Sequence, residues 1–337
     1  MPIFMIGIQR SGSNLLRLML NQLPNIAAPH PPHILQRMMP LVPVYGNLDD
    51  ERSFATLVDD VCRLVELNPV PWEGVELDRQ RVAAKCRQRS LVGIFGAVYQ
   101  VFAEARGAED WLCKSMQNTS YLKEIEACFP DAKYLYLYRD GRDVAVSFRK
   151  AVVGEKHYYH IAKEWADTQR LALTHRAIVP SERFASISYE DLTAHPSETM
   201  QRLCAFLNVT YHDSMLDFYR SEEAHRAAES STLWSNVVKP VMAGNTRKFL
   251  REASEDDIRC FESVAGEMLD ALGYARAFVP SGQEQKFTEA DIRRFDEENR
   301  RLKEETRLNT DADDLKRRGL QDSLLGEIRG RKQTAPL

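Results

Sequence analysis

The sequence predicts an α/β fold in which a central parallel sheet lies between layers of helices. Four short apolar segments have the composition of buried strands, at residues 3–8, 111–114, 133–138 and 184–188. Helical patterns separate them, and strands that alternate with helices indicate a parallel sheet. The first strand also runs directly into a glycine-containing turn and an apolar helix, which is typical of a phosphate-binding loop. We therefore expect a P-loop-like three-layer fold.

The turn after the first strand is the first candidate site. It reads Arg10-Ser11-Gly12-Ser13-Asn14-Leu15, and the helix is expected to begin at Asn14. Unpaired backbone N–H groups and the helix dipole create an anion site there, and Gly12 permits close approach of a ligand. Taken by itself, the same loop would also fit an ordinary strand-to-helix turn.

The loop departs from the motif of nucleoside triphosphate-binding proteins. The spacing from Gly7 to Gly12 matches the first half of G-x-x-x-x-G-K-[ST], but Ser13-Asn14 stands where Lys-Ser/Thr is required. The loop therefore lacks the lysine that contacts the β- and γ-phosphates and the hydroxyl that binds magnesium. Arg10 instead supplies a cation whose forked donors suit the leaving phosphate of a transferred group.

Length and composition indicate one main domain in the cytoplasm. The chain has 337 residues, 44% of them hydrophobic, and a net charge of −4, so nothing in its overall charge favours nucleic acid or an anionic membrane. Six cysteines without a C-x-x-C pair read as reduced core residues. No apolar run approaches the roughly 18 residues of a membrane span, and a strand at residue 3 leaves no room for a signal peptide.

Two segments flank or interrupt the predicted domain of residues 1–280. Residues 36–110 form a helical insertion, which we expect to serve as a lid over the acceptor of a reaction. Residues 281–337 form a charged helical tail with 13 Lys/Arg and 13 Asp/Glu. A solvated helix is the preferred interpretation of this tail, although a thin apolar stripe leaves a partner contact or a homo-oligomer open.

A second candidate anion site follows the strand at residues 133–138. Arg139 ends this strand, Gly141 provides a turn, and a helix that carries Ser147 begins. Ligands bind at the carboxyl ends of the strands in open parallel sheets, so this site is expected beside the first one. Two anion sites suit a ligand with phosphates at both ends of its ribose.

Together these segments resemble the sulfotransferases that use 3′-phosphoadenosine 5′-phosphosulfate, particularly their bacterial branch. The resemblance covers about residues 1–275 and implies a P-loop-like fold. It implies that residues 10–15 hold the 5′-phosphosulfate and that Arg139 and Ser147 hold the 3′-phosphate. It also places Tyr189, in Ser188-Tyr189-Glu190-Asp191-Leu192, near the adenine, and suggests a basic loop over the 3′-phosphate with Arg247 and Lys248 as its cations.

The resemblance leaves the general base open between two histidines. Cytosolic eukaryotic members carry Lys-Thr-His after the second strand, with the histidine as base, whereas this chain has Lys114-Ser115-Met116. Other members place a base after the first helix, where this chain has His30 and His33. We favour His33 slightly, with packing in a turn as the alternative for both. Lys114 would contact the sulfuryl group or the acceptor, or simply be solvated.

The predicted function is transfer of a sulfuryl group from 3′-phosphoadenosine 5′-phosphosulfate to a hydroxyl or amine of a small-molecule, lipid or carbohydrate acceptor. No metal is expected, since cations and backbone donors can stabilise the leaving phosphate and the histidines show no ligand spacing. A P-loop small-molecule kinase and a non-catalytic nucleotide-binding protein remain the alternatives. Nothing in the sequence selects the acceptor.

Overall fold

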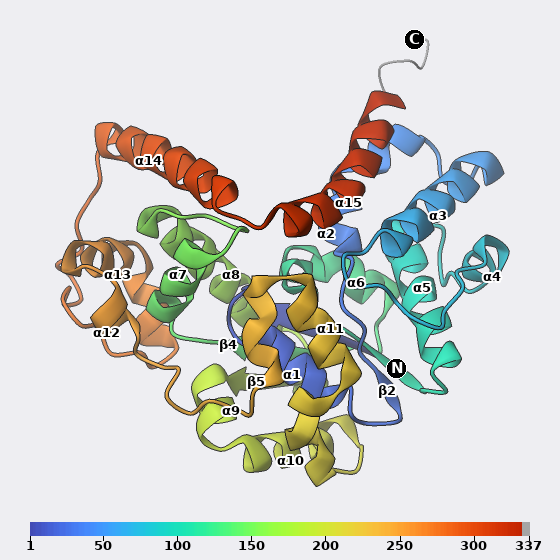
Figure 1. Cartoon of the computed structure of the whole chain (residues 1–337), viewed down its shortest axis with the longest axis horizontal. Helices are drawn as coiled ribbons and strands as arrows, with labels where there is room; N and C mark the ends of the chain where they lie inside the picture. The colour runs from blue at the N-terminus through green and yellow to red at the C-terminus, as the bar shows by residue number, and fades with distance from the viewer. Residues whose placement is uncertain (332–337) are drawn as a thin grey trace.

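A five-stranded parallel sheet forms the centre of the molecule (Figure 1). The computed structural model describes residues 1–331, and of residues 232 and 233 only the backbone. The strand order is β2-β3-β1-β4-β5, and every pairing is parallel, so the predicted α/β fold is confirmed. The strands are β1 (Pro2–Gly7), β2 (Ile26–Ala27), β3 (Asp110–Cys113), β4 (Lys133–Tyr138) and β5 (Phe184–Ser188). The sequence did not predict the two-residue strand β2.

The strand order places two loops side by side at the carboxyl edge of the sheet. The chain leaves β1 towards β2 and β3 on one side, and β4 and β5 lie on the other side. The order therefore reverses between β1 and β4, where parallel sheets bind their ligands. Gly7 pairs with Leu137 near the end of this strand pair, so the turns that follow both strands start close together.

The two faces of the sheet bury different cores. Phe4 and Ile6 of β1 belong to the core beneath the insertion helices, whereas Ile3 and Met5 belong to the core beneath α1. This alternation follows from the two-residue period of a strand. The helices that precede residue 130 are α1 (Ser13–Leu20), α2 (Ile34–Met38), η1 (Met39–Tyr45), α3 (Glu51–Glu66), α4 (Arg79–Ala84), α5 (Leu91–Ala105), η2 (Met116–Tyr121) and α6 (Leu122–Cys128).

Later helices cover the remaining surface of the sheet and its carboxyl edge. They are α7 (Gly141–Lys150), α8 (Tyr158–Arg176), η3 (Ser181–Arg183), α9 (Tyr189–Ala194), α10 (Pro196–Leu207), η4 (Asp213–Arg220), α11 (Glu222–Ser230), η5 (Thr232–Val238), α12 (Phe249–Glu252), α13 (Glu255–Ala271), α14 (Glu289–Leu308) and α15 (Ala312–Arg331). α8 packs along α13, and Trp165 and Phe261 meet there in a separate core with 5.8 Å between ring centroids.

The insertion is helical, as its pattern indicated, and contributes a layer of the main core. α5 is buried over most of its length, and Phe95 stacks on Phe4 of the central strand with 5.8 Å between ring centroids. Its role as a lid stays a prediction. All six cysteines are free thiols.

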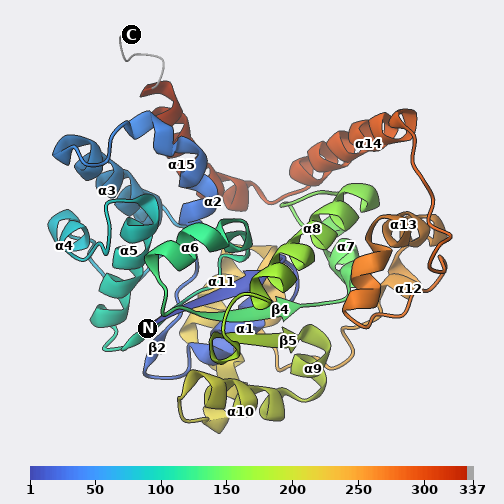
Figure 2. The same ribbon diagram turned by 180° about the vertical axis from the view of Figure 1, so that it is seen from behind.

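The two helices of the tail fold back onto the domain (Figure 2). α15 buries Leu324, Leu325 and Ile328 in the same core as α3 and α5, and Phe295 of α14 stacks on His157 at 4.4 Å. The tail is therefore more than a solvated helix, because part of its apolar surface is used within the chain. Within residues 1–331, every helix is too short or too polar to cross a membrane.

Candidate active site

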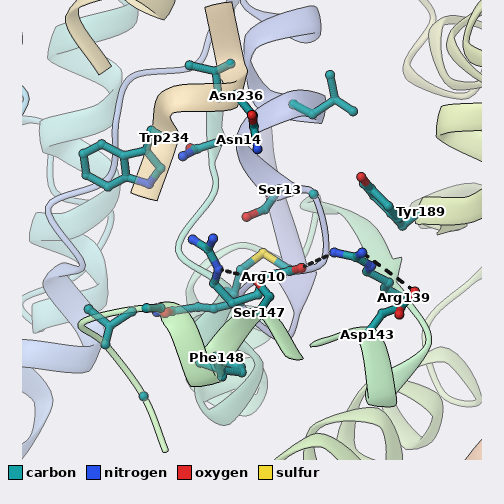
Figure 3. Close-up of a pocket in the computed structure, with 18 of the residues that line it drawn as sticks. Arg10, Ser13, Asn14, Arg139, Asp143, Ser147, Phe148, Tyr189, Trp234 and Asn236 are labelled. Carbon is teal, nitrogen blue, oxygen red and sulfur yellow. Dashed lines mark hydrogen bonds and ion pairs between the residues drawn. The ribbon is translucent and has the colours of Figure 1, made fainter. Parts of the chain in front are cut away.

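A cavity of about 700 Å³ opens at the carboxyl edge of the sheet. Loops that follow β1, β3, β4 and β5 all contribute to its lining. Of the residues that the sequence predicted, it contains Arg10, Gly12, Ser13, Asn14, Leu15, His33, Lys114, Arg139, Ser147, Tyr189 and Lys248. Ser11, His30 and Arg247 are not part of the lining. Figure 3 shows how several of these side chains converge.

The loop after β1 is built around two residues in the left-handed region. Arg10 has φ 69° and Gly12 has φ 91°, and Gly12 is the N-cap of α1. A Cβ at Gly12 would lie 2.4 Å from the ring of Tyr189, so the loop and this ring are in close contact. Ser11 is fully buried, and its hydroxyl has no hydrogen-bond partner among the described residues.

Two arginines meet at the centre of the site. Arg10 Nε donates to Ser147 Oγ (2.9 Å), and Arg139 Nη1 donates to the carbonyl of Arg10 (3.1 Å). Burial, and then the charge of Arg139, lowers the pKa of Arg10 to about 10. Arg139 is itself buried, and the nearest carboxylate oxygen of Asp143 lies 3.8 Å from it. The pair is therefore a concentration of positive charge that a bound anion would stabilise.

Arg139 also connects the start of α9 and the loop after η5 to the site. Its guanidinium lies over the ring of Tyr189 at 4.2 Å, and Nη2 donates to the carbonyl of Asn245 (2.7 Å). The side chain of Asn245 donates to the hydroxyl of Tyr189 (2.6 Å). Trp165 Nε1 donates to the backbone carbonyl of Arg139 (3.2 Å). These contacts fix the positions of the Arg139 guanidinium group and the Tyr189 ring.

Asp143 anchors the basic segment at residues 245–249. Its carboxylate accepts from the backbone N–H groups of Arg247 (2.7 Å) and Phe249 (3.0 Å). The side chain of Arg247 is exposed, whereas Lys248 lines the cavity. The segment therefore reaches the site through Lys248 and Asn245 rather than through the side chain of Arg247.

The two candidate bases have different surroundings. His33 lines the cavity with φ 58°, and its Nδ1 lies 2.9 Å from Ser115 Oγ. Burial, and then the charge of Lys114, lowers the pKa of His33 to about 3. His30 is buried against Trp234, with 4.6 Å between ring centroids, and burial lowers its pKa well below the usual value.

Lys114 follows β3 and is buried at the floor of the site. Burial, and then the charges of Arg17 and Arg10, lowers its pKa to about 7. Its ammonium group is therefore easily deprotonated in the free protein. An anion bound nearby would favour the charged form.

Comparison with known proteins agrees with this geometry. Residues 2–213 match the model of a family described as the sulfotransferase family. This chain belongs to the sulfotransferase family. It is 23% identical over 284 residues to a protein-tyrosine sulfotransferase of Drosophila melanogaster, covering 81% of this chain and 51% of that protein. It is 24% identical over 290 residues to protein-tyrosine sulfotransferase A of Caenorhabditis elegans, covering 81% and 67%. The chain thus spans about half of the length of the fruit-fly relative.

Two solved structures share the fold of this chain. The sulfotransferase domain from the curacin biosynthetic pathway superposes with a TM-score of 0.57 at 22% identity, covering 82% of this chain and 98% of that one. The sulfotransferase domain of the Synechococcus PCC 7002 olefin synthase gives a TM-score of 0.53 at 22% identity, covering 79% and 94%.

Several residues that line the cavity were missed by the sequence reasoning. Glu164 of α8 accepts from Gln117 Nε2 (3.3 Å), and burial, and then the charge of Glu155, raises its pKa. Trp234 of η5 and Arg318 of α15 also line the cavity. Each belongs to a segment without a recognisable motif, so only the folded chain brings it to the site. Among the described residues, no group of three or more His, Cys, Asp or Glu is placed to hold a metal ion.

Proposed function

We propose that the protein transfers a sulfuryl group from 3′-phosphoadenosine 5′-phosphosulfate to a hydroxyl or amine acceptor. The observation that carries this proposal is the meeting of Arg10 and Arg139 in one cavity, each directly after one of two neighbouring central strands. A donor with phosphates at both ends of a ribose matches two adjacent cations. Membership of the sulfotransferase family supports the same reaction.

The residues present fit this donor. Arg10 and the N–H groups at the start of α1 would hold the 5′-phosphosulfate, and Arg139 and the hydroxyl of Ser147 would hold the 3′-phosphate. The buried Ser11 Oγ and Arg139 Nε have no hydrogen-bond partners among the described residues, so two donors remain for a ligand. The ring of Tyr189 beside Gly12 offers an aromatic surface for the adenine. When bound, the donor supplies the activated sulfuryl group.

The chain's own residues would stabilise charge and move one proton. Arg10 and the loop amides would stabilise the negative charge that develops on the leaving 5′-phosphate, and Lys114 would contact the sulfuryl group. His33 is neutral at pH 7 because of its low pKa. If its Nδ1–H donates to Ser115, its Nε2 can accept the proton of the acceptor hydroxyl. His30, which lies outside the cavity lining, is the second candidate base.

Calorimetry with 3′-phosphoadenosine 5′-phosphate tests the donor site. We expect the wild-type protein to bind this product without magnesium and in preference to ADP. The variant Arg10→Ala loses a charge-assisted contact of about 1.5–3 kcal/mol, so its affinity should fall by about ten- to a hundredfold. Arg170→Ala removes an exposed arginine of α8 and serves as control. Full sulfuryl transfer by Arg10→Ala would refute the assignment of Arg10.

Two other functions give different results in the same experiments. A small-molecule kinase should consume ATP in a magnesium-dependent reaction and show no preference for a 3′-phosphorylated adenosine. A non-catalytic nucleotide-binding protein should bind the product but never transfer label from the activated donor. The absence of the Lys-Ser/Thr pair after Gly12 argues against the kinase.

The acceptor is best found by a screen with labelled donor. Hydroxylated small molecules, lipids and carbohydrates belong in it, and the similarity to protein-tyrosine sulfotransferases adds tyrosine-containing peptides. A cytoplasmic location, the independence from metal and the homo-oligomer through the C-terminal helix stay predictions.

A further inference from the structure

The two C-terminal helices each hold one wall of the cavity. α14 contacts the segment at residues 151–157, and α15 contacts the segment at residues 231–237. We propose that Asn299 of α14 and Asp314 of α15 are positioning residues that keep these two walls in place, so that the C-terminal helices belong to the active site. This inference rests on the proposed function, because it assigns the walls to the acceptor end of that site.

The first wall depends on the side chain of Asn299. This side chain is buried, and its Oδ1 accepts from the backbone N–H groups of Lys156 (2.8 Å) and His157 (3.0 Å). Its Nδ2 donates to the carboxylate of Glu155, which also pairs with Lys303 of α14 at 2.7 Å. These three side-chain hydrogen bonds of Asn299 all go to residues 155–157.

This segment forms part of the cavity surface. Val153, Gly154 and Glu155 line the cavity next to Phe148. Gly154 has φ 75°, and a Cβ there would lie 2.4 Å from the ring of Phe148, so the segment lies directly on the end of α7. Because residues 151–157 themselves form no strand or helix, their position depends on contacts such as those with Asn299.

The second wall depends on Asp314. This carboxylate is 2% exposed, accepts from Ser231 Oγ (2.6 Å) and pairs with Arg318 Nε (2.7 Å). Arg318 lies over the ring of Trp234 at 5.7 Å, and Arg317 Nη2 donates to the carbonyl of Ser230 (2.9 Å). The start of η5 is therefore bonded to one turn of α15.

This second segment reaches the acceptor end of the site. Trp234 and Asn236 line the cavity, together with Arg318 itself. In Figure 3 Trp234 lies on the opposite side of Arg10 from Tyr189 and Arg139, which form the proposed donor end. The contacts that fix Arg10, Arg139 and Tyr189 at the end of the site proposed for the sulfuryl donor involve neither Asn299 nor Asp314. Loosening these walls should therefore leave donor binding intact.

Hydrogen exchange of the full chain, measured by mass spectrometry, tests the proposal. In Asn299→Ala the amides of Lys156 and His157 lose their acceptor, so exchange in residues 153–160 should be at least about tenfold faster. In Asp314→Ala the hydrogen bond from Ser231 and the ion pair with Arg318 are lost, so exchange in residues 230–237 should also be at least about tenfold faster. Asn309→Ala changes the exposed C-cap residue of α14, and Asp313→Ala changes an exposed residue of α15, and both should leave the two segments as in the wild type.

A conservative variant separates positioning from simple packing. Asn299→Asp keeps an oxygen acceptor for both amides but sets a second carboxylate against Glu155, so it is combined with Glu155→Gln, whose amide group can donate to it. This double variant should restore much of the protection that Asn299→Ala removes. In every variant the affinity for 3′-phosphoadenosine 5′-phosphate should stay within about twofold of wild type.

Wild-type exchange at both segments in both alanine variants would overturn the proposal. So would equal exchange in Asn299→Ala and in the double variant Asn299→Asp with Glu155→Gln, because the amides would then not depend on the acceptor oxygen. If the alanine variants do not fold, the single variants Asn299→Asp and Asp314→Asn decide. Asn299→Asp should loosen residues 153–160 through repulsion of Glu155, and Asp314→Asn should loosen residues 230–237 through loss of the Arg318 ion pair. Wild-type exchange in both would contradict the proposal. If the wild-type protein does not bind the product at all, the proposed function fails, while the exchange data still decide whether the helices hold the walls.

Discussion

Gly12 occupies a position from which both the backbone and a neighbour exclude a side chain. Its φ of 91° is unfavourable for an L-residue, and a Cβ would lie 2.4 Å from Tyr189. We expect Gly12→Ala to lose about 1–3 kcal/mol of stability and at least about tenfold in affinity for 3′-phosphoadenosine 5′-phosphate. Urea unfolding and calorimetry measure the two effects.

Gly244 provides the matched control for this substitution. It lies directly before the basic segment at residues 245–249, but a Cβ there would meet nothing within 4 Å. Gly244→Ala should therefore leave both quantities near their wild-type values. Equal effects of the two substitutions would show that the shape of the loop after β1 is unimportant.

Lys114 should make donor binding depend on pH. Its pKa of about 7 in the free protein means that it is increasingly neutral above pH 7, and a bound anion would raise this pKa. Binding above pH 7 should therefore take up a proton, and the affinity for 3′-phosphoadenosine 5′-phosphate should fall as the pH rises from 7 to 9. Calorimetry at pH 8 in two buffers of different ionisation enthalpy measures the uptake. In Lys114→Met the uptake should decrease, and an unchanged uptake would assign it to another group.

The same lysine predicts the direction of the stability change. The folded-state pKa of about 7 lies below the ordinary lysine pKa of 10.5, so the unfolded chain binds more protons between these two values. The contribution of Lys114 to the free energy of unfolding should therefore rise with pH across this window. The comparison of wild type with Lys114→Met in urea at pH 7 and pH 9 isolates it.

At the scale of elements, α7 joins the two halves of the donor site. Asp143 in its first turn and Ser147 one turn later lie on the same face, at the i, i+4 spacing of a helix. Ser147 bonds Arg10, whereas Asp143 bonds the backbone of residues 247 and 249. One short helix thus connects the first loop of the chain to its basic segment.

Removing Asp143 should detach the basic segment without unfolding α7. We expect Asp143→Ala to speed hydrogen exchange in residues 245–249 and to weaken binding of 3′-phosphoadenosine 5′-phosphate by about tenfold or more, because Lys248 and Asn245 lose their support. Asp167→Ala, an exposed change on α8, is the control. Protection of residues 245–249 equal to wild type would contradict the anchoring role.

Elements with a local pattern were the ones that could be predicted from the sequence. The apolar runs of β1 and β4 can be recognised within a few consecutive residues. The spacing from Arg139 to Ser147 can likewise be recognised within one short stretch of sequence. β2 was missed because two residues carry no periodicity, and its existence depends on pairing with β3. α5 shows why an insertion is hard to interpret, because an apolar helix fits a lid or a core equally well until its packing is known.

At the scale of the whole molecule, α15 should unfold together with the sheet. Ile328 is fully buried in the core beneath α3, so Ile328→Ala should cost about 2–5 kcal/mol of stability and keep a single unfolding transition. Leu320→Ala on the same helix is the control, since Leu320 is 51% exposed. Urea unfolding followed by circular dichroism measures both. A separate early transition that alone shifts in Ile328→Ala would show that the tail is an independent unit.

The parts of the site that could not be predicted are those that depend on tertiary packing. Arg10, Arg139 and Ser147 belong to recognisable sequence motifs, but Glu164 and Arg318 lie in ordinary charged helices. The way in which such a helix packs on the protein decides which of its charged residues reaches a cavity. The spacing of charges along the sequence carries no information about this packing. The surroundings of His30 and His33 likewise differ through tertiary packing, because Trp234, which is distant in sequence, packs against His30.

The cavity lining runs from Gln9 to Arg318, and this span bears on how the protein acquires activity during folding. Contacts between residues so distant in sequence form late, because closing the long intervening loop costs entropy before any contact compensates for it. A growing polypeptide can assemble the sheet once β5 is synthesised, yet lacks a complete acceptor end until α15 docks. Ligands that touch this end would therefore protect from proteolysis only those chains in which α15 has docked, and would leave partly folded forms to be degraded.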